Sequence, residues 1–155
     1  MATPKSYKEV VETIESIVNS HIAVAQFAVG LNSDIDVETN TKNPVKYPLV
    51  FLRPEQSYMQ KFGKLSLGFT LSVLDISHDQ ELYEINGHNS TLMILQDILS
   101  KIYLDLNIDL NIEDIVNITP ITGRYNNMLL GWEAILLLDV QSPYNLCDSP
   151  FDGSI

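Results

Sequence analysis

The last strongly apolar stretch of the chain, residues 129–141, has the pattern of one long β-strand that ends before Pro143. Side chains of a strand point alternately to its two faces. One face would carry Trp132, Ala134, Leu136, Leu138 and Val140. The opposite face would carry Glu133, Ile135, Leu137 and Asp139. An antiparallel strand usually keeps one face polar, so the apolar middle of this second face needs a cover, either a helix of the same chain or another subunit.

Two other segments have the three-and-four spacing of amphipathic helices. Residues 6–22 begin with Ser6 and Glu9, placed as in a capping box. The apolar positions that follow are Val10, Val11, Ile14, Ile17, Val18 and Ile22. The second helix is expected to begin at Asn89 or Ser90, after a polar connection over residues 78–88. Its apolar stripe is wide enough to predict a buried helix and comprises Leu92, Ile94, Leu95, Ile98, Leu99, Ile102 and Leu106.

Further strands are predicted at residues 26–29, 47–52, 65–73 and 115–121. In 65–73 the apolar residues alternate with Ser66, Gly68, Thr70 and Ser72, which is typical of a half-buried strand. The alternation breaks at Leu74, so a bulge or the end of the strand is expected there. Pro48 favours an edge strand or a strand end, and Pro54 is expected to close or bend its strand. Residues 53–64 would join two antiparallel strands, and they include Tyr58, which allows the hairpin to continue beyond the core as an arm.

The order of these elements predicts an α+β fold in a single domain, residues 1–155. We expect a mostly antiparallel sheet of four to five strands with two helices on one face. The other face would remain half-apolar. Residues 31–46 form a long polar loop in this prediction, and residues 142–155 form an extended C-terminal tail. Loops of this length in a compact domain are usually functional or disordered.

The net charge of −11 is unevenly distributed. Residues 102–155 carry eight acids and only Arg124 as a base, whereas residues 31–64 carry five bases and four acids. Stable nucleic-acid binding needs cations that displace phosphate counterions, and this balance opposes it. The charge has two compatible interpretations. It keeps the protein soluble, or its acidic part repels DNA while the mildly basic part contacts an acidic neighbour.

The residues that could support chemistry give weak patterns. Asp34, Asp36 and Glu38 alternate as Ca²⁺ ligands can, but the places of the EF-hand glycine and final glutamate hold Thr39 and Val45. We therefore prefer a solvated or subunit-contacting loop to a metal site. The histidines, His21, His78 and His88, lack the four-residue spacing of a helical metal pair. Cys147 has no basic neighbour to stabilise a thiolate and is followed by Asp148. We predict neither catalytic residues nor a cofactor.

Three large aromatic residues accompany the final strand, and each has two interpretations. Trp132, Tyr144 and Phe151 could pack in the core or serve as interface anchors, where Trp and Tyr are enriched. Tyr144 and Phe151 lie in the proline-flanked tail, so we favour an interface for them. The predicted contact residues are Asp34, Asp36, Glu38, Tyr58, Ile135, Leu137, Tyr144 and Phe151.

Three stretches resemble the small neck or tail-completion proteins of tailed bacteriophages, particularly phages of gut and marine Bacteroidetes. They are FAVGLNSDID with YPLVFL after it, the helix STLMILQDILSKI, and the ending GWEAILLLDVQSPYNLCDSP. The order of elements is also similar to that of the tail terminators of long-tailed phages. The resemblance covers about residues 7 to 151, nearly the whole chain.

This resemblance implies a non-enzymatic virion protein of the phage neck or tail, assembled in the host cytoplasm. Such proteins form hexameric or dodecameric rings between connector and tail proteins and have no cofactor. DNA would pass through the lumen only as non-specific cargo. The chain also shows no signal peptide and no run of about 18 apolar residues, so we expect no membrane partner.

The alternative is a small cytoplasmic ligand-binding module or enzyme that uses the exposed sheet face as its pocket. An enzyme should gather polar groups with shifted pKa values in a cleft. A thermal-shift screen with metals and nucleotides separates the two hypotheses, since a ligand that strongly raises the melting temperature would favour the second.

Overall fold

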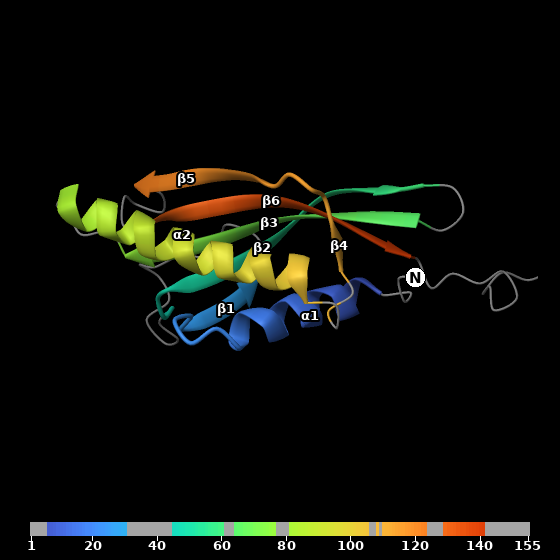
Figure 1. Cartoon of the computed structure of the whole chain (residues 1–155), viewed down its shortest axis with the longest axis horizontal. Helices are drawn as coiled ribbons and strands as arrows, with labels where there is room; N and C mark the ends of the chain where they lie inside the picture. Colours follow the sequence, from blue (N-terminus) through green and yellow to red (C-terminus); the bar gives the residue numbers. More distant parts are fainter. Residues whose placement is uncertain are drawn as a thin grey trace, which may run out of the picture.

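The structure, a computed structural model, describes residues 6–30, 45–60, 64–76, 81–105, 108, 110–123 and 129–141. In chain order the elements are α1 (Tyr7–Asn19), β1 (Gln26–Val29), β2 (Leu49–Met59), β3 (Lys64–Ile76), α2 (Glu81–Leu104), β4 (Asn111–Ile112), β5 (Asn117–Gly123) and β6 (Leu129–Gln141). Two helices with a mixed sheet make an α+β fold, as predicted (Figure 1).

All described strands belong to one six-stranded sheet with the order β1-β2-β3-β6. β4 and β5 both pair with the remaining edge of β6, one behind the other. β1 and β2 run parallel, and the other neighbours run antiparallel. The prediction of four to five strands was wrong because it missed β4, which spans only Asn111–Ile112. A strand of two residues is too short to show an alternating pattern.

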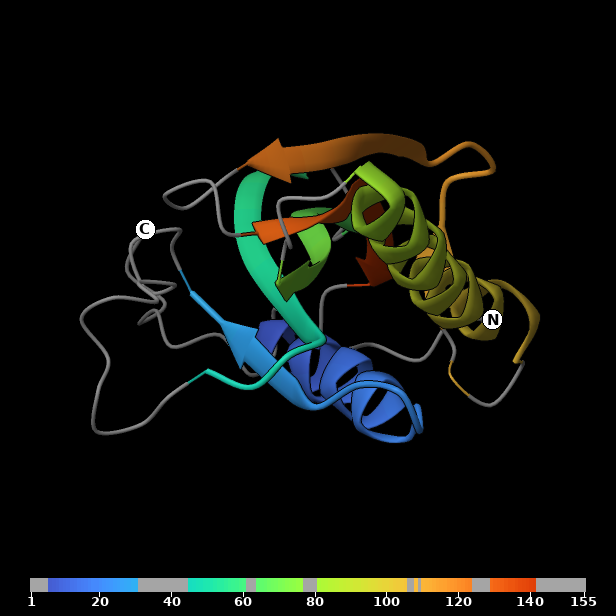
Figure 2. The same cartoon turned by 90° about the vertical axis from the view of Figure 1, so that its left-hand side faces the viewer.

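Both helices pack on the same face of the sheet, as predicted (Figures 1 and 2). The main core lies between them and that face. Its largest fully buried members include Ile14, Leu52, Phe69, Leu71, Leu95 and Ile98. The opposite face, which we call the helix-free face, carries every second residue of the central strands. On β3 and β6 these residues are Ser66, Gly68, Thr70, Ser72, Leu74, Gly131, Glu133, Ile135, Leu137 and Asp139.

The start of α1 follows the predicted capping box. The Ser6 hydroxyl accepts a hydrogen bond from the Glu9 backbone N–H at 3.2 Å, and the Glu9 carboxylate accepts one from the Ser6 N–H at 3.4 Å. The predicted end was wrong, because α1 stops at Asn19. Ile22 lies beyond the helix and is fully exposed, so it contributes nothing to the apolar face.

β2 is longer than predicted, because Pro54 does not end it. β1 pairs only with residues 49–52, so the section of β2 around Pro54 has one described neighbour, β3. A proline is tolerated there because no second strand needs its missing N–H. Pro48 does mark the strand end, as predicted, since β2 begins at the next residue. A register shift between Glu55 and Tyr58 then bends the strand.

β3 contradicts two predictions. Its pairing with β6 continues without a break from Lys64 to Ile76, so there is no bulge at Leu74. Leu74 instead lies on the helix-free face, in a second small core with Leu49, Phe51, Ile121 and Leu129. Ser66, Thr70 and Ser72 were expected to face solvent, but they are only 3%, 4% and 7% exposed. Small side chains on a central strand are shielded by longer ones on both neighbouring strands.

α2 begins at Glu81, so the predicted cap at Asn89 or Ser90 was wrong. Both residues lie inside the helix on its exposed side. Gly87 explains why this early part packs closely. A Cβ atom at position 87 would come within 2.6 Å of Leu130 Cδ1, so a larger residue there would require the Leu130 side chain to move. The helix ends at Leu104, before the predicted Leu106.

The sequence patterns predicted the positions of β5 and β6 closely. β5 begins at Asn117 rather than residue 115, and Ile115 is 78% exposed. β6 runs over Leu129–Gln141 and carries the two predicted faces. It lies between β3 and the β4–β5 pair, so both of its edges are hydrogen-bonded over most of its length.

Candidate subunit interface

Three of the residues predicted for an interface lie on the helix-free face. Tyr58 of β2 is opposite Ser66, and Leu137 and Ile135 of β6 are opposite Gly68 and Thr70. Tyr58 is 52% exposed, Ile135 is 59% exposed, and Leu137 is half-buried. They therefore form an apolar group on two strands, separated by the small residues of β3. No described helix covers them.

The other predicted contact residues cannot be placed. Asp34, Asp36 and Glu38 lie in the 31–46 loop, and Tyr144 and Phe151 lie in the 142–155 tail. All five are outside the described residues. The proposal that these segments contact a neighbour thus stays a prediction from the sequence.

Polar side chains around the apolar group are connected by hydrogen bonds and an ion pair. The Ser66 hydroxyl donates to Asp139 Oδ1 at 2.5 Å, and the Lys64 ammonium lies 3.5 Å from Asp139 Oδ2. On the β2 side, the Thr70 hydroxyl donates to Glu55 Oε1 at 2.8 Å. These bonds satisfy the buried hydroxyls of Ser66 and Thr70, so the helix-free face is polar around its apolar centre.

Glu55 is the group whose titration the structure changes most clearly. The hydrogen bond from Thr70 and the hydrogen bond and charge of Arg53, whose Nε lies 2.7 Å from Glu55 Oε1, lower the pKa of this carboxyl. Slight burial acts in the opposite direction but does not outweigh them. Glu55 is therefore ionised at neutral pH and holds Arg53 against the sheet.

We expect Glu55→Gln to lower the free energy of unfolding at pH 7 by about 0.5 kcal/mol, because the side chain is 37% exposed and solvent screens its ion pair. The folded-state pKa is depressed, so this stabilisation is complete above the ordinary value of 4.5 and is lost as pH falls through the folded-state pKa. Urea denaturation of both proteins at neutral and acidic pH measures it. A stability gap that stays constant into strong acid would contradict the assignment.

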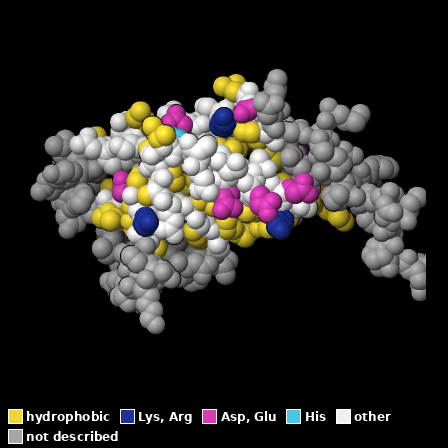
Figure 3. Space-filling view, turned by 90° about the horizontal axis from the view of Figure 1, so that it is seen from below, with side chains coloured by type: hydrophobic (Ala, Val, Ile, Leu, Met, Phe, Trp, Pro, Cys, Tyr) yellow, Lys and Arg dark blue, Asp and Glu magenta, His cyan; other side chains and the backbone are white. Residues whose placement is uncertain are grey.

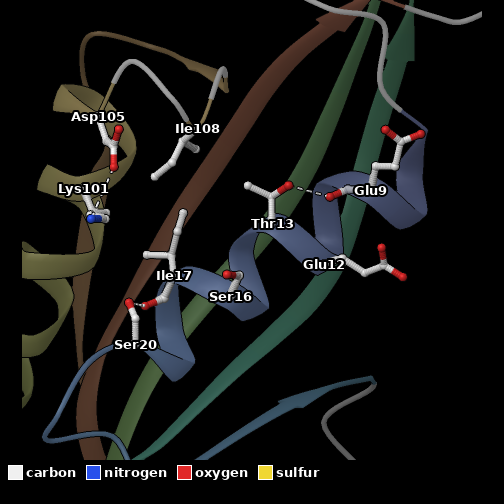
Figure 4. A pocket seen from close by; sticks show the side chains of 9 residues that line it. All are labelled: Glu9, Glu12, Thr13, Ser16, Ile17, Ser20, Lys101, Asp105 and Ile108. Atoms are coloured by element: carbon white, nitrogen blue, oxygen red, sulfur yellow. Dashed lines mark hydrogen bonds and ion pairs between the residues drawn. The ribbon is translucent and has the colours of Figure 1, made fainter.

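A groove that the sequence did not predict lies between α1 and the C-terminal part of α2. It measures about 570 Å³ in its larger section, and Ile17 and Ile108 point toward each other across it (Figure 4). A smaller section of about 300 Å³ shares Ile17, Ser20 and Lys101 with it and extends to Ile98. We call the two sections together the α1–α2 groove. Since its walls come from segments about 80 residues apart in the sequence, no local pattern could reveal it.

The rim of the α1–α2 groove is acidic. Four carboxylates line it, from Glu9, Glu12, Asp97 and Asp105. The Lys101 ammonium lies 3.2 Å from Asp105, and His21 Nε2 lies 2.8 Å from Asp97. Figure 3, seen from the side of α1, shows a row of Asp and Glu side chains with hydrophobic and Lys or Arg side chains beside it. The Lys8 ammonium also lies 3.7 Å from Glu12, so three of the four carboxylates have a basic residue beside them.

Trp132 and His88 have structural positions. Trp132 is half-buried on the helical face, and its Nε1–H donates to the His88 carbonyl at 2.9 Å. The His88 ring lies edge-on to the Trp132 ring, and its Nε2 is 3.0 Å from the Ile121 carbonyl oxygen. The two residues join α2 to β5 and β6, which favours the core interpretation of Trp132 over the interface one.

Within the described part of the chain, no three His, Cys, Asp or Glu side chains are grouped to hold a metal ion. His78 and Cys147 lie outside that part. Among the described helices, none combines the length and apolar character needed to span a membrane.

Comparison of the sequence with models of known protein families gives no match, and comparison with curated protein sequences gives none either.

Proposed function

We propose that this protein is the subunit of a homo-oligomeric ring at the head–tail junction or tail end of a tailed bacteriophage, where it joins connector and tail and leaves a channel for DNA. The observation that carries the assembly part is the apolar group of Tyr58, Ile135 and Leu137 on a sheet face that no described helix covers. The phage part rests on the sequence resemblance of three stretches, one of which covers β6 from Gly131 onward.

The energetic argument concerns Ile135 most directly. Burying apolar surface contributes about 25 cal/mol per Å², so a neighbour that covers Ile135 and Tyr58 gains from each. Single exposed apolar residues are common on monomers. Here, however, the exposed residues share one face of the sheet, and Tyr is enriched at interface centres. The surrounding Ser66, Asp139 and Lys64 provide a polar rim.

The acidity of the chain is compatible with a DNA channel. A subunit with net charge −11 offers DNA few cations for phosphate contacts, so DNA would slide rather than bind. In a hexamer or dodecamer every copy would bring the same net negative charge to the ring. The proposed partners are other copies of the chain and the neighbouring connector and tail proteins, and no cofactor or catalytic residue takes part.

The substitution Ile135→Asp tests the assembly proposal. A carboxylate at the centre of the contact should be desolvated on assembly, so we expect each subunit contact to weaken by about 30-fold or more. The fold should remain, because the side chain is already 59% exposed. Native mass spectrometry gives the oligomeric state, and a thermal melt reports on folding.

Ile118→Asp is the matched control for this experiment. Ile118 is 41% exposed on β5, next to β6, but its side chain alternates to the other face of the sheet. The Ile118→Asp substitution should therefore leave assembly unchanged. If the Ile135→Asp protein keeps the mass of the wild-type oligomer, the helix-free face is not the subunit contact.

A further inference from the structure

The connection between α1 and β1 contains a histidine whose two ring nitrogens both have partners. His21 follows the last residue of α1 by two positions, and its side chain is 16% exposed. Its Nδ1 accepts a hydrogen bond from the Ala23 backbone N–H at 3.1 Å, and its Nε2 lies 2.8 Å from Asp97 Oδ2 on α2. The ring therefore holds the turn after α1 and connects this turn to the second helix.

These two contacts determine where the proton of the ring lies. A backbone N–H can only donate, so Nδ1 is the acceptor and carries no proton. An ionised carboxylate can only accept, so Nε2 carries the proton and donates to Asp97. The contact with Ala23 is thus the histidine counterpart of an Asx-turn, in which a side-chain oxygen accepts from the N–H two residues later.

A second proton on the ring would affect the two contacts in opposite ways. The imidazolium is a donor at both nitrogens, so Nδ1–H would face the Ala23 N–H and this hydrogen bond would be lost. The contact with Asp97 would remain and become an ion pair, which solvent screens because the Asp97 side chain is 63% exposed. Histidine is the side chain suited to change its charge between about pH 5 and 8.

We propose that His21 is an acid-sensitive latch for the connection between α1 and β1. Near neutral pH the latch is closed, since the neutral ring accepts from Ala23. On acidification the ring gains a proton and releases the Ala23 N–H while it keeps Asp97. The connection then loosens where it borders the smaller section of the α1–α2 groove. The latch belongs to the fold of one copy and does not depend on the proposed ring function.

The charged groups that face the ring lie on α2. Within the described part of the chain, Asp97 and Lys101 line the smaller section of the groove beside His21, and its other lining residues are uncharged. Lys101 lies 3.2 Å from Asp105, which offsets its charge (Figure 4). Asp97 favours the protonated ring, so its charge promotes opening of the latch.

Amide hydrogen exchange followed by NMR tests the latch, with each rate divided by the rate of an unstructured peptide at the same pH. We expect the protection of the Ala23 amide to fall by about 5-fold from pH 8 to 5, because it loses one hydrogen bond. The Val10 amide, which donates to the Ser6 carbonyl oxygen at the other end of α1, should keep its protection. The nitrogen chemical shifts of the His21 ring should show the proton on Nε2 at neutral pH.

Two variants distinguish the latch from a histidine that only fills space. His21→Asn places an oxygen near the position of Nδ1 and cannot gain a proton in this range, so the Ala23 amide should stay protected at every pH. His21→Gln places its amide near the position of Nε2 and leaves Ala23 without this acceptor. Its Ala23 protection should be low at both pH values.

Asp97→Asn removes the charge that favours the protonated ring but keeps an oxygen that can accept from Nε2. The fall in Ala23 protection should therefore shift to lower pH. Three results would each overturn the latch. They are constant Ala23 protection in the wild type, an equal fall in His21→Asn, and a shift to higher pH in Asp97→Asn.

Discussion

Replacing Trp132 with alanine is expected to lower the free energy of unfolding by about 3–5 kcal/mol. The indole packs against the main core between the sheet and α2. Its removal leaves a cavity there and breaks the hydrogen bond from Nε1 to the His88 carbonyl at 2.9 Å. The edge-on contact with the His88 ring, whose centroid is 6.0 Å away, is lost as well. Urea denaturation followed by circular dichroism measures the change.

Trp132→Phe separates the two contributions. Phenylalanine keeps an aromatic ring in the core but has no N–H donor, so the expected loss is about 1–2 kcal/mol. A folded Trp132→Ala protein of wild-type stability that fails only to assemble would show instead that Trp132 contacts a neighbouring subunit.

Replacing the adjacent Gly131 with alanine is expected to cost about 3 kcal/mol or more, from strain and overpacking together. Gly131 has φ +157°, a conformation that side-chain-bearing residues rarely adopt. A Cβ atom there would lie only 1.8 Å from the Val73 carbonyl oxygen on the neighbouring strand. The obstacle is backbone in the centre of the sheet, so it cannot move aside as a flexible side chain could.

Ser90→Ala is the control for Gly131→Ala. Ser90 is exposed on α2, where alanine is the better helix former, so its effect should be close to zero. Thermal melts of both variants should differ by about 10 °C, given the usual relation between stability and melting temperature for a chain of this size. Equal melting temperatures would mean that β6 and β3 can separate at this point without cost.

The strongest local patterns predicted the fold well. The alternation around β6 gave both of its faces, because side-chain direction in a strand depends only on neighbouring positions. The capping box at Ser6 and Glu9 placed the start of α1 for the same reason. The apolar stripes of the two helices also indicated one shared sheet face, which the main core confirms.

The errors arose where tertiary contacts replace local signals. The first turns of α2 have no apolar period, so residues 78–88 were predicted as a polar connection, although Gly87 packs beside Leu130. Pro54 was expected to close or bend its strand. It is tolerated inside β2 because β1 pairs only with residues 49–52, and the local sequence does not show where β1 stops. Ser66, Thr70 and Ser72 of β3 were expected to be exposed. The side chains that shield them belong to adjacent strands, which a local pattern does not show.

The candidate interface was predictable in part. Ile135 and Leu137 followed from an apolar middle on the second face of one strand, and Tyr58 from the length of the hairpin. The α1–α2 groove could not be predicted, because it depends on the spacing of two helices that are distant in sequence. A row of carboxylates on an amphipathic helix looks like an ordinary solvated face until the second helix is in position.

The mass of the purified wild-type protein in solution tests the central claim most directly, because that claim is that other copies cover the helix-free face. Native mass spectrometry over a wide range of concentrations should show one closed oligomer with a fixed number of copies, hexameric or dodecameric, and no continuous series of sizes. A single copy at every concentration would contradict the account.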